Sequence, residues 1–198
     1  MRRSLASKRD EAAFRAKQQQ LEELKRQEDE GEIELYFYDE AGFSLLPTVP
    51  YAWQAKGETT LLSSGRSKSL NVLGLLRRNG DFASYVVEGS VDSDTVVAML
   101  DDFVTGLRSS NKAVIVLDNA PTHSSEVFEA KRAQWQERNV EICYLSSYSP
   151  ELNLIERLWQ ELKYRWLPFE AYLSFQNLRD YLMKVLAEVG SELTISFA

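Results

Sequence analysis

Residues 113–118 have the sequence AVIVLD, five apolar residues followed by an acid. An apolar run without polar alternation is typical of a strand buried on both faces of a sheet. Such a strand carries its last residue, Asp118, to the carboxyl end of the sheet, where α/β proteins form their sites. The next residues, Asn119-Ala120-Pro121, turn the chain sharply. This stretch therefore predicts a sheet covered by helices, with an acid at its edge.

Strand and helix patterns alternate on both sides of this stretch. Strands are expected at 33–39, 70–76, 82–88 and 141–145, and helices at 7–31, 92–107, 125–138, 149–166 and 175–188. Asn79-Gly80 is a strong hairpin signal between two of the strands. A Pro- and Gly-punctuated stretch around residues 51–53 is expected to form a hairpin-like excursion. The order predicts an α/β fold, a mixed sheet flanked by helices, in which the first strand lies beside 113–118.

The chain divides into three expected parts. Residues 1–31 form a charged helix or linker, an N-terminal helical extension in which Phe14, Leu21 and Leu24 make a thin apolar stripe. Residues 32–190 form the main domain, and residues 191–198 form a C-terminal tail. The stripe is too short for a coiled coil, so the helix is expected to pack lightly on the domain.

Cysteine and histidine usage restricts the kinds of site. Cys143 and His123 are the single residues of their types. Disulfides, cysteine-based zinc clusters and multi-histidine sites are therefore excluded. Carboxylates are the remaining ligands, and they favour Mg²⁺ or Mn²⁺. No run approaches the roughly 20 apolar residues that span a bilayer, and no secretory signal is present, so a cytoplasmic setting is expected.

The net charge of −7 argues against tight autonomous binding to DNA. The charge is uneven, however. Residues 56–78 form a basic strip with one acid, Glu58, and five cations: Lys56, Arg66, Lys68, Arg77 and Arg78. Such a strip can contact nucleic acid, while most of the affinity has to come from elsewhere.

Two more acids stand beside Asp118 as candidates for metal binding. Asp39 directly continues the apolar run 33–38 and is favoured over Glu40, which starts the next turn. Glu156 is expected one turn into a helix that Ser149-Pro150 opens. It lies at the edge of the core stripe of that helix, formed by Leu152, Ile155, Trp159, Leu162 and Trp166. Two strand-end aspartates and a helical glutamate are suited to holding a pair of divalent ions against a phosphodiester.

Other acids and polar groups near these positions have simpler explanations. Glu151 complements the dipole of the predicted helix, and Glu161 is expected on its solvated face. His123 follows Asp118 by five residues and is either a supporting group behind the metal ligands or a structural histidine. Trp53 is the one tryptophan considered for stacking on a base or sugar.

The three acids occur in sequence blocks that resemble the signature blocks of DDE transposases in the mariner superfamily, above all its bacterial insertion-sequence branch. The blocks are YDEAGF at 38–43, LDNAPTH at 117–123 and SPELNLIERLW at 149–159, with 37 residues between Asp118 and Glu156. The resemblance covers about residues 10–190. It implies a ribonuclease H-like catalytic domain at 32–190, with Asp39, Asp118 and Glu156 as the catalytic triad and metal ligands.

The resemblance also implies a reaction and its partners. Family members excise an element at its terminal inverted repeats and insert it at TA dinucleotides. The acids would hold two Mg²⁺ ions, with Mn²⁺ as a substitute, for strand cleavage and then for attack of the freed 3′-OH on target DNA. A dimer assembled on DNA in the nucleoid is expected. Asn119, His123, Trp53, Lys56, Arg66 and Lys68 are the candidate DNA-contacting residues.

The chain departs from the family pattern at two places. Leu154 stands where proline is common, a mild change if the position lies inside a helix. The N-terminal helix-turn-helix region of the family is absent, so a separate DNA-binding polypeptide is expected to supply end recognition. Two other functions stay open: a ribonuclease H-like nuclease without strand transfer, and an inactive interaction module.

Overall fold

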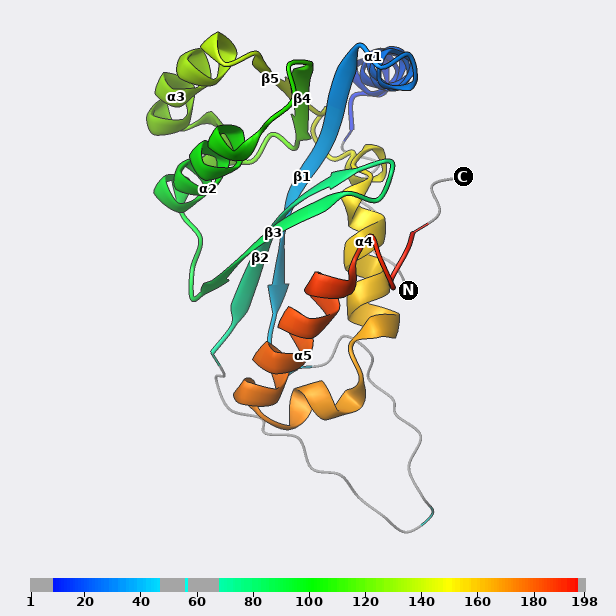
Figure 1. The fold of residues 1–198 in the computed structure, drawn as a ribbon, viewed down its shortest axis with the longest axis vertical. Coiled ribbons are helices and arrows are strands. Elements are labelled where there is room, and N and C mark those ends of the chain that lie inside the picture. Colours follow the sequence, from blue (N-terminus) through cyan, green and yellow to red (C-terminus); the bar gives the residue numbers. More distant parts are fainter. Residues whose placement is uncertain (1–8, 47–55, 57–67, 196–198) are drawn as a thin grey trace.

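A computed structural model of the protein describes residues 9–46, 56 and 68–195. Its five strands form one mixed sheet in the order β3-β2-β1-β4-β5 (Figure 1). The strands are β1 Ile33–Phe43, β2 Leu70–Arg77, β3 Phe82–Glu88, β4 Lys112–Leu117 and β5 Val140–Tyr144. The first three are antiparallel, whereas β4 and β5 run parallel to β1. The sequence-based prediction of a mixed sheet, with the first strand beside 113–118, is therefore confirmed.

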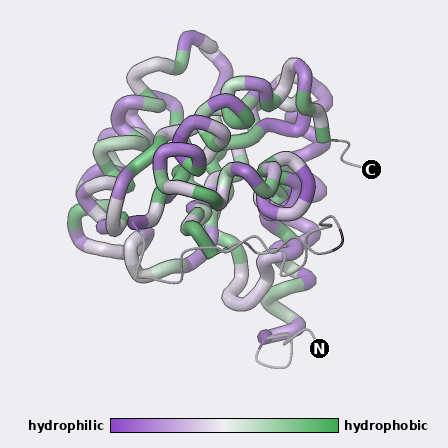
Figure 2. Tube along the Cα trace, turned by 90° about the horizontal axis from the view of Figure 1, so that it is seen from below, coloured by the Kyte–Doolittle hydropathy of each residue, from purple (hydrophilic) through white to green (hydrophobic). Residues whose placement is uncertain are grey.

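Helices cover both faces of the sheet (Figure 1). One face packs against α2 (Ser93–Gly106) and α3 (Glu126–Glu137). The opposite face packs against α1 (Glu11–Asp29), α4 (Ile155–Glu161) and α5 (Phe175–Glu188). Apolar segments, green in Figure 2, concentrate toward the middle of the molecule. Burial on both faces is why β4 is apolar from Ala113 to Leu117.

Four of the helices begin where the sequence supplies an N-terminal cap. The side chains of Asp10, Asp92, Ser125 and Ser174 accept hydrogen bonds from backbone N–H groups in the first turns of α1, α2, α3 and α5. These bonds satisfy donors that a helix leaves without partners at its start. The helices at 92–107, 125–138 and 175–188 are therefore confirmed to within a residue or two.

The first strand is longer than predicted. β1 continues to Phe43, paired antiparallel with β2 from Tyr36–Arg77 to Phe43–Leu70. Asp39 therefore lies inside the strand, and the prediction that it ends the strand is wrong. Its pairing with β4 does stop early, at Phe37–Val116. Beyond that point β1 keeps one strand neighbour, which leaves its other edge open.

The predicted helix at 149–166 is divided into three segments. Pro150–Leu152 form a single 3₁₀ turn, in which Ser149 makes no capping bond, and Asn153 then adopts an extended backbone. The α-helix begins only at Ile155, so Glu156 lies in its first turn, and a π-helical segment, Leu162–Trp166, follows it. Leu154 immediately precedes α4, outside the helix, where a proline is sterically compatible.

Arginines near the end of β2 are tied to α1. Arg78 pairs with Glu28 at 3.2 Å and Asp29 at 2.8 Å. Arg77 lies 3.8 Å from the same Glu28 and pairs with Glu34 of β1 at 3.3 Å. Leu21 of α1 is buried in the core. These contacts fasten the N-terminal helix to the sheet and neutralise two cations of the predicted basic strip, so Arg77 and Arg78 are not free for nucleic acid.

No helix among the described residues is long and apolar enough to cross a membrane.

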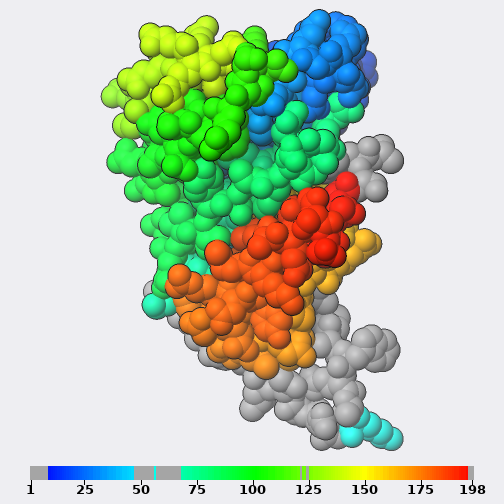
Figure 3. Space-filling view, viewed as in Figure 1, coloured from blue at the N-terminus to red at the C-terminus, as the bar shows by residue number. Residues whose placement is uncertain are grey.

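Two glycines allow close packing on the β2 side of the sheet. The segment after α5, red in Figure 3, lies against the β2–β3 hairpin, where a Cβ on Gly190 would lie 2.5 Å from the Gly80 carbonyl oxygen. Gly74 pairs with Asp39 in the sheet. A Cβ there would lie 2.7 Å from Trp159 Cη2 and 3.0 Å from Ile155 Cδ1. Gly74 therefore makes room for α4 next to Asp39.

We expect Gly74→Ala to destabilise the fold by ~1–3 kcal/mol, because the added methyl group overpacks the interface with Trp159. Urea unfolding measures this change. Gly106→Ala is the matched control, because its Cβ would meet nothing within 4 Å. That substitution should be neutral or slightly stabilising in the helix. Equal stability for both variants would contradict close packing at Gly74.

Candidate active site

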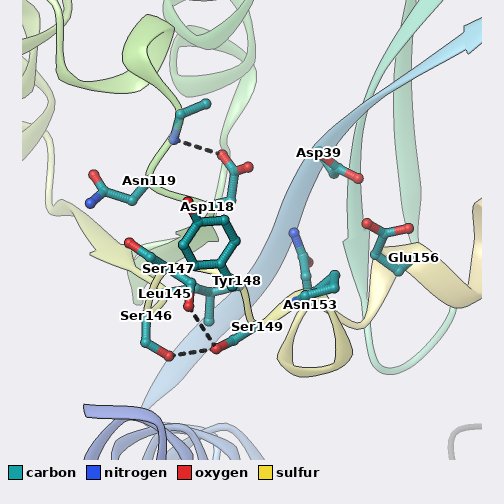
Figure 4. A pocket seen from close by; sticks show the side chains of 12 residues that line it. Asp39, Asp118, Asn119, Leu145, Ser146, Ser147, Tyr148, Ser149, Asn153 and Glu156 are labelled. Atoms are coloured by element: carbon teal, nitrogen blue, oxygen red, sulfur yellow. Dashed lines mark hydrogen bonds between the residues drawn. The ribbon is translucent and has the colours of Figure 1, made fainter. Parts of the chain in front are cut away.

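A pocket of about 350 Å³ opens where β1 and β4 separate. Asp39 of β1, Asp118 just after β4 and Glu156 of α4 all line it. The loop between β5 and α4 forms much of the remaining wall, as Figure 4 shows, with Leu145, Ser146, Ser147, Tyr148, Ser149, Pro150 and Asn153. The structure therefore brings all three predicted acids to one pocket.

Asp39 is the acid set deepest in the sheet. Its Oδ2 accepts a hydrogen bond from the Trp159 indole Nε1 at 3.1 Å. Burial, and then the nearby charge of Glu156, raise the pKa of Asp39 to about 7. The neighbouring Glu40 is not among the pocket residues, because side chains alternate along the strand. The choice of Asp39 over Glu40 as the pocket acid agrees with this placement.

Glu156 faces Asp39 from the first turn of α4 (Figure 4). Burial raises its pKa, Lys163 opposes that rise, and the charge of Asp118 adds to it. Two acids with raised pKa values thus share one side of the pocket. This is the expected behaviour of clustered carboxylates without a cation between them.

Asp118 is exposed, and its carboxylate is held away from the other two. Its Oδ1 accepts from the Ala120 N–H at 3.1 Å and pairs with His123 Nδ1 at 2.8 Å. The hydrogen bond from His123 keeps the pKa of Asp118 below its usual value. Among the described residues, no three His, Cys, Asp or Glu side chains lie close enough together to hold a metal ion.

His123 is buried between two acids, only 3% exposed. Its Nε2 lies 3.3 Å from Glu40 Oε1, and its Nδ1 faces Asp118. Burial opposes protonation, but the hydrogen bonds to Asp118 and Glu40 outweigh it and raise the pKa of His123 to about 9. The histidine therefore contacts one pocket acid directly from behind, without lining the pocket itself.

The other predicted DNA-contacting residues are dispersed. Asn119 lines the pocket. Lys56 is exposed, and Lys68 is paired with Glu88 at 2.8 Å, with neither of them among the pocket residues. Trp53, Arg66 and the excursion expected around 51–53 lie outside the residues that the structure describes.

Three residues of the site are not predicted from the sequence to be site residues. Trp159 belongs to the apolar stripe of the predicted helix. It is buried, and its indole also donates to Asp39. Asn153 is 4% exposed and donates through Nδ2 to the Tyr38 carbonyl at 2.8 Å. Tyr148 has a φ of 60°, a left-handed conformation unusual for a bulky residue. For Asn153 the sequence holds one signal: asparagine favours caps and turns over helix interiors, yet it lies within a stretch predicted to be helical.

A family model for DDE superfamily endonucleases matches residues 34–179. The chain belongs to this family. The matched range contains Asp39, Asp118 and Glu156, and it extends from β1 into α5. The DDE superfamily assignment confirms the family resemblance inferred from the three sequence blocks.

Curated and solved relatives agree with the DDE assignment. An insertion element IS630 uncharacterized 39 kDa protein from Shigella sonnei is 25% identical over 131 residues, 65% of this chain and 37% of that protein. The Mos1 transposase paired-end complex with left transposon end superposes with a TM-score of 0.63 at 17% identity, over 90% of this chain and 55% of that one. The catalytic domain of Mos1 mariner transposase gives a TM-score of 0.56 at 15% identity, over 90% and 82%.

The structural likeness confirms the ribonuclease H-like fold. The chain spans 37% of the length of the IS630 relative and 55% of the Mos1 chain in its paired-end complex.

We expect Asp39→Asn to stabilise the metal-free protein at pH 8 but not near pH 4. The pKa of Asp39 rises from 3.8 to about 7 on folding. The preference of the folded protein for the protonated carboxyl group therefore contributes fully to stability below pH 3.8, and this contribution is lost as the pH rises through 7. Asparagine keeps an acceptor for Trp159 without the charge. The difference should reach up to ~4 kcal/mol at pH 8, at about 1.4 kcal/mol per pKa unit.

Urea unfolding in EDTA between pH 4 and 8.5 measures this difference. Glu161→Gln serves as the control, because Glu161 is on the same helical segment as Glu156 but pairs with Arg165 at the surface. A stability difference for Asp39→Asn that stays constant across this pH range would refute the raised pKa.

Proposed function

We propose that this chain is the catalytic domain of a transposase that cleaves DNA at the ends of a mobile element and joins the freed 3′-OH to target DNA. The observation that carries the proposal is the convergence of Asp39, Asp118 and Glu156 on one pocket. The three acids come from separate sequence blocks, and the chain belongs to the DDE superfamily endonucleases.

The three acids would hold divalent cations, with Mg²⁺ as the proposed ion, Mn²⁺ as its substitute, and two ions in the complete site. Their oxygen donors fit such hard cations. Divalent ions supply activation of the attacking hydroxyl group and stabilisation of the departing 3′-oxygen in phosphoryl transfer. Mos1 paired-end complexes have been solved with Mn and with Mg, which supports the choice.

Each neighbouring side chain has a defined part in this proposal. Trp159 orients the Asp39 carboxylate through its indole N–H. His123 holds the Asp118 carboxylate on the far side of the pocket while no cation offsets the repulsion among the acids. Assembly of the complete site requires Asp118 to exchange its contacts with His123 and Ala120 for the ion.

DNA is the proposed partner, as element end and as target. Solved Mos1 relatives are a paired-end complex with a transposon end and a strand transfer complex, which supports this choice. Asn119 at the pocket wall and the exposed Lys56 are proposed to contact the phosphate backbone of the DNA. A separate helix-turn-helix polypeptide would supply end recognition, and a dimer would form on paired ends in the nucleoid.

Saturating Mn²⁺ should raise the melting temperature of the wild-type protein by about 5–10 °C at 100 times the dissociation constant. The gain arises because the ion binds the folded state and removes the repulsion between Asp39 and Glu156. Differential scanning fluorimetry in a Mn²⁺ series measures it. Glu156→Gln should abolish the shift, whereas Glu161→Gln should retain it.

The proposed activity is tested on supercoiled plasmid with Mn²⁺, which needs no knowledge of the element ends. Wild-type protein should nick the plasmid. Asp118→Asn should lower the rate by more than about 100-fold, since loss of even an outer partner of a metal ligand costs 10–100-fold. The exposed Asp180→Asn is the control for loss of a surface carboxylate.

Strand transfer is tested with a labelled duplex that ends in a free 3′-OH and carries a terminus of the insertion element that flanks the coding sequence. Label joined to plasmid by the wild type, but not by Asp118→Asn, supports a transposase. Nicking without joined product would reassign the chain as a nuclease. Equal background in wild type and variant would leave the inactive-module alternative.

A further inference from the structure

One buried polar atom in the pocket has no partner. Among the described residues, only Arg77 Nε and Asn153 Oδ1 are buried side-chain polar atoms without a hydrogen bond. Arg77 Nε still has the Glu28 carboxylate 3.8 Å away. Asn153 Oδ1 accepts no hydrogen bond, and the residue is only 4% exposed. An unpaired buried acceptor is rare in native proteins and is commonly explained by a bound ion or water.

The orientation of the Asn153 amide is fixed by its other end. Nδ2 donates to the Tyr38 carbonyl at 2.8 Å. Exchanging the two amide atoms would place Oδ1 against that carbonyl oxygen, two acceptors face to face. Tyr38 is the first residue of β1 beyond its pairing with β4, and it directly precedes Asp39. The donor half of Asn153 therefore anchors the loop to the strand that carries the deepest acid.

Asn153 belongs to the wall of the pocket. Asn153 lines the pocket together with Asp39, Asp118 and Glu156, and its side chain rises from the loop between Asp118 and Glu156 in Figure 4. The backbone breaks its helical course at this residue, with φ −89° and ψ 107°, between the 3₁₀ turn and α4. The interruption places Asn153, whose Oδ1 is unpaired, on the wall of the pocket that the three acids also line.

We propose that Asn153 is a positioning residue for the divalent ion: its Oδ1 accepts a hydrogen bond from a water molecule of the ion's hydration shell. This inference rests on the proposed metal-dependent function. Mg²⁺ keeps several of its waters when proteins bind it, and the hydrogens of those waters need acceptors. An amide oxygen provides one without adding a fourth negative charge to the acids. The Asn153 Nδ2 meanwhile keeps its hydrogen bond to the Tyr38 carbonyl.

The test is Mn²⁺ binding without DNA, measured from the free-ion signal in electron paramagnetic resonance. Asn153→Leu should weaken Mn²⁺ binding about tenfold, as loss of an outer partner of a metal site does. The metal-free melting temperature should also fall, because the substitution leaves the buried Tyr38 carbonyl without the Asn153 N–H, so Mn²⁺ affinity is the deciding measurement.

A purely structural asparagine predicts the lower metal-free melting temperature alone, with Mn²⁺ affinity unchanged. Asn177→Leu is the matched control: Asn177 also donates to a backbone carbonyl, that of Glu170 at 3.0 Å, but on α5. Its loss should leave Mn²⁺ affinity unaltered. Asn153→Asp keeps oxygen acceptors at the position and should bind Mn²⁺ at least as tightly as the wild type.

The outcomes separate this inference from the proposed function. A wild type that binds no Mn²⁺ refutes the metal site as a whole. A wild type that binds Mn²⁺, with Asn153→Leu binding it equally well, refutes only the role of Asn153. If Asn153→Leu does not fold, weaker Mn²⁺ binding by a folded Asn153→Asp likewise overturns the proposal.

Discussion

The placement of the Asp39 carboxylate inside the sheet is the constraint on which the site depends. A charged carboxylate away from water is unfavourable unless opposite charge or several donors surround it. Here the indole of Trp159 is the donor that reaches it from another side chain, and the next acid, Glu156, repels it. The pKa of Asp39 is therefore raised, and a cation in the pocket would favour its ionised form.

The sheet topology creates the space for this acid. β1 pairs parallel with β4 on one edge and antiparallel with β2 on the other, and the parallel pairing ends at Phe37–Val116. The two strands then separate, one ending in Asp118 and the other continuing through Asp39. The β5–α4 loop and the start of α4 occupy the gap, and Asn153 replaces the missing strand partner by binding the Tyr38 carbonyl.

Sequence patterns predicted the order of elements and the pocket acids because both depend on local signals. The apolar run 113–117, the caps of the helices and the three acidic blocks are all visible within short stretches. The interruption of the helix at Asn153 is not visible in this way. Ser149-Pro150 has the composition of a helix start, whereas the hydrogen bond of Asn153 to the Tyr38 carbonyl joins residues 115 positions apart. The pairing of Asp118 with His123 is a choice of side-chain conformation, and neutralisation of Arg78 by α1 depends on tertiary packing.

The long sequence separation of these contacts has a consequence for the newly made chain. Trp159 binds Asp39 across 120 residues, and Glu156 reaches the pocket from the same late segment. Folds built on such distant pairings form slowly, since each loop must close before its contacts are gained. During synthesis Asp39 therefore stays in water with an ordinary acidity. A growing polypeptide therefore lacks the complete pocket of Asp39, Asp118 and Glu156 until α4 has been translated.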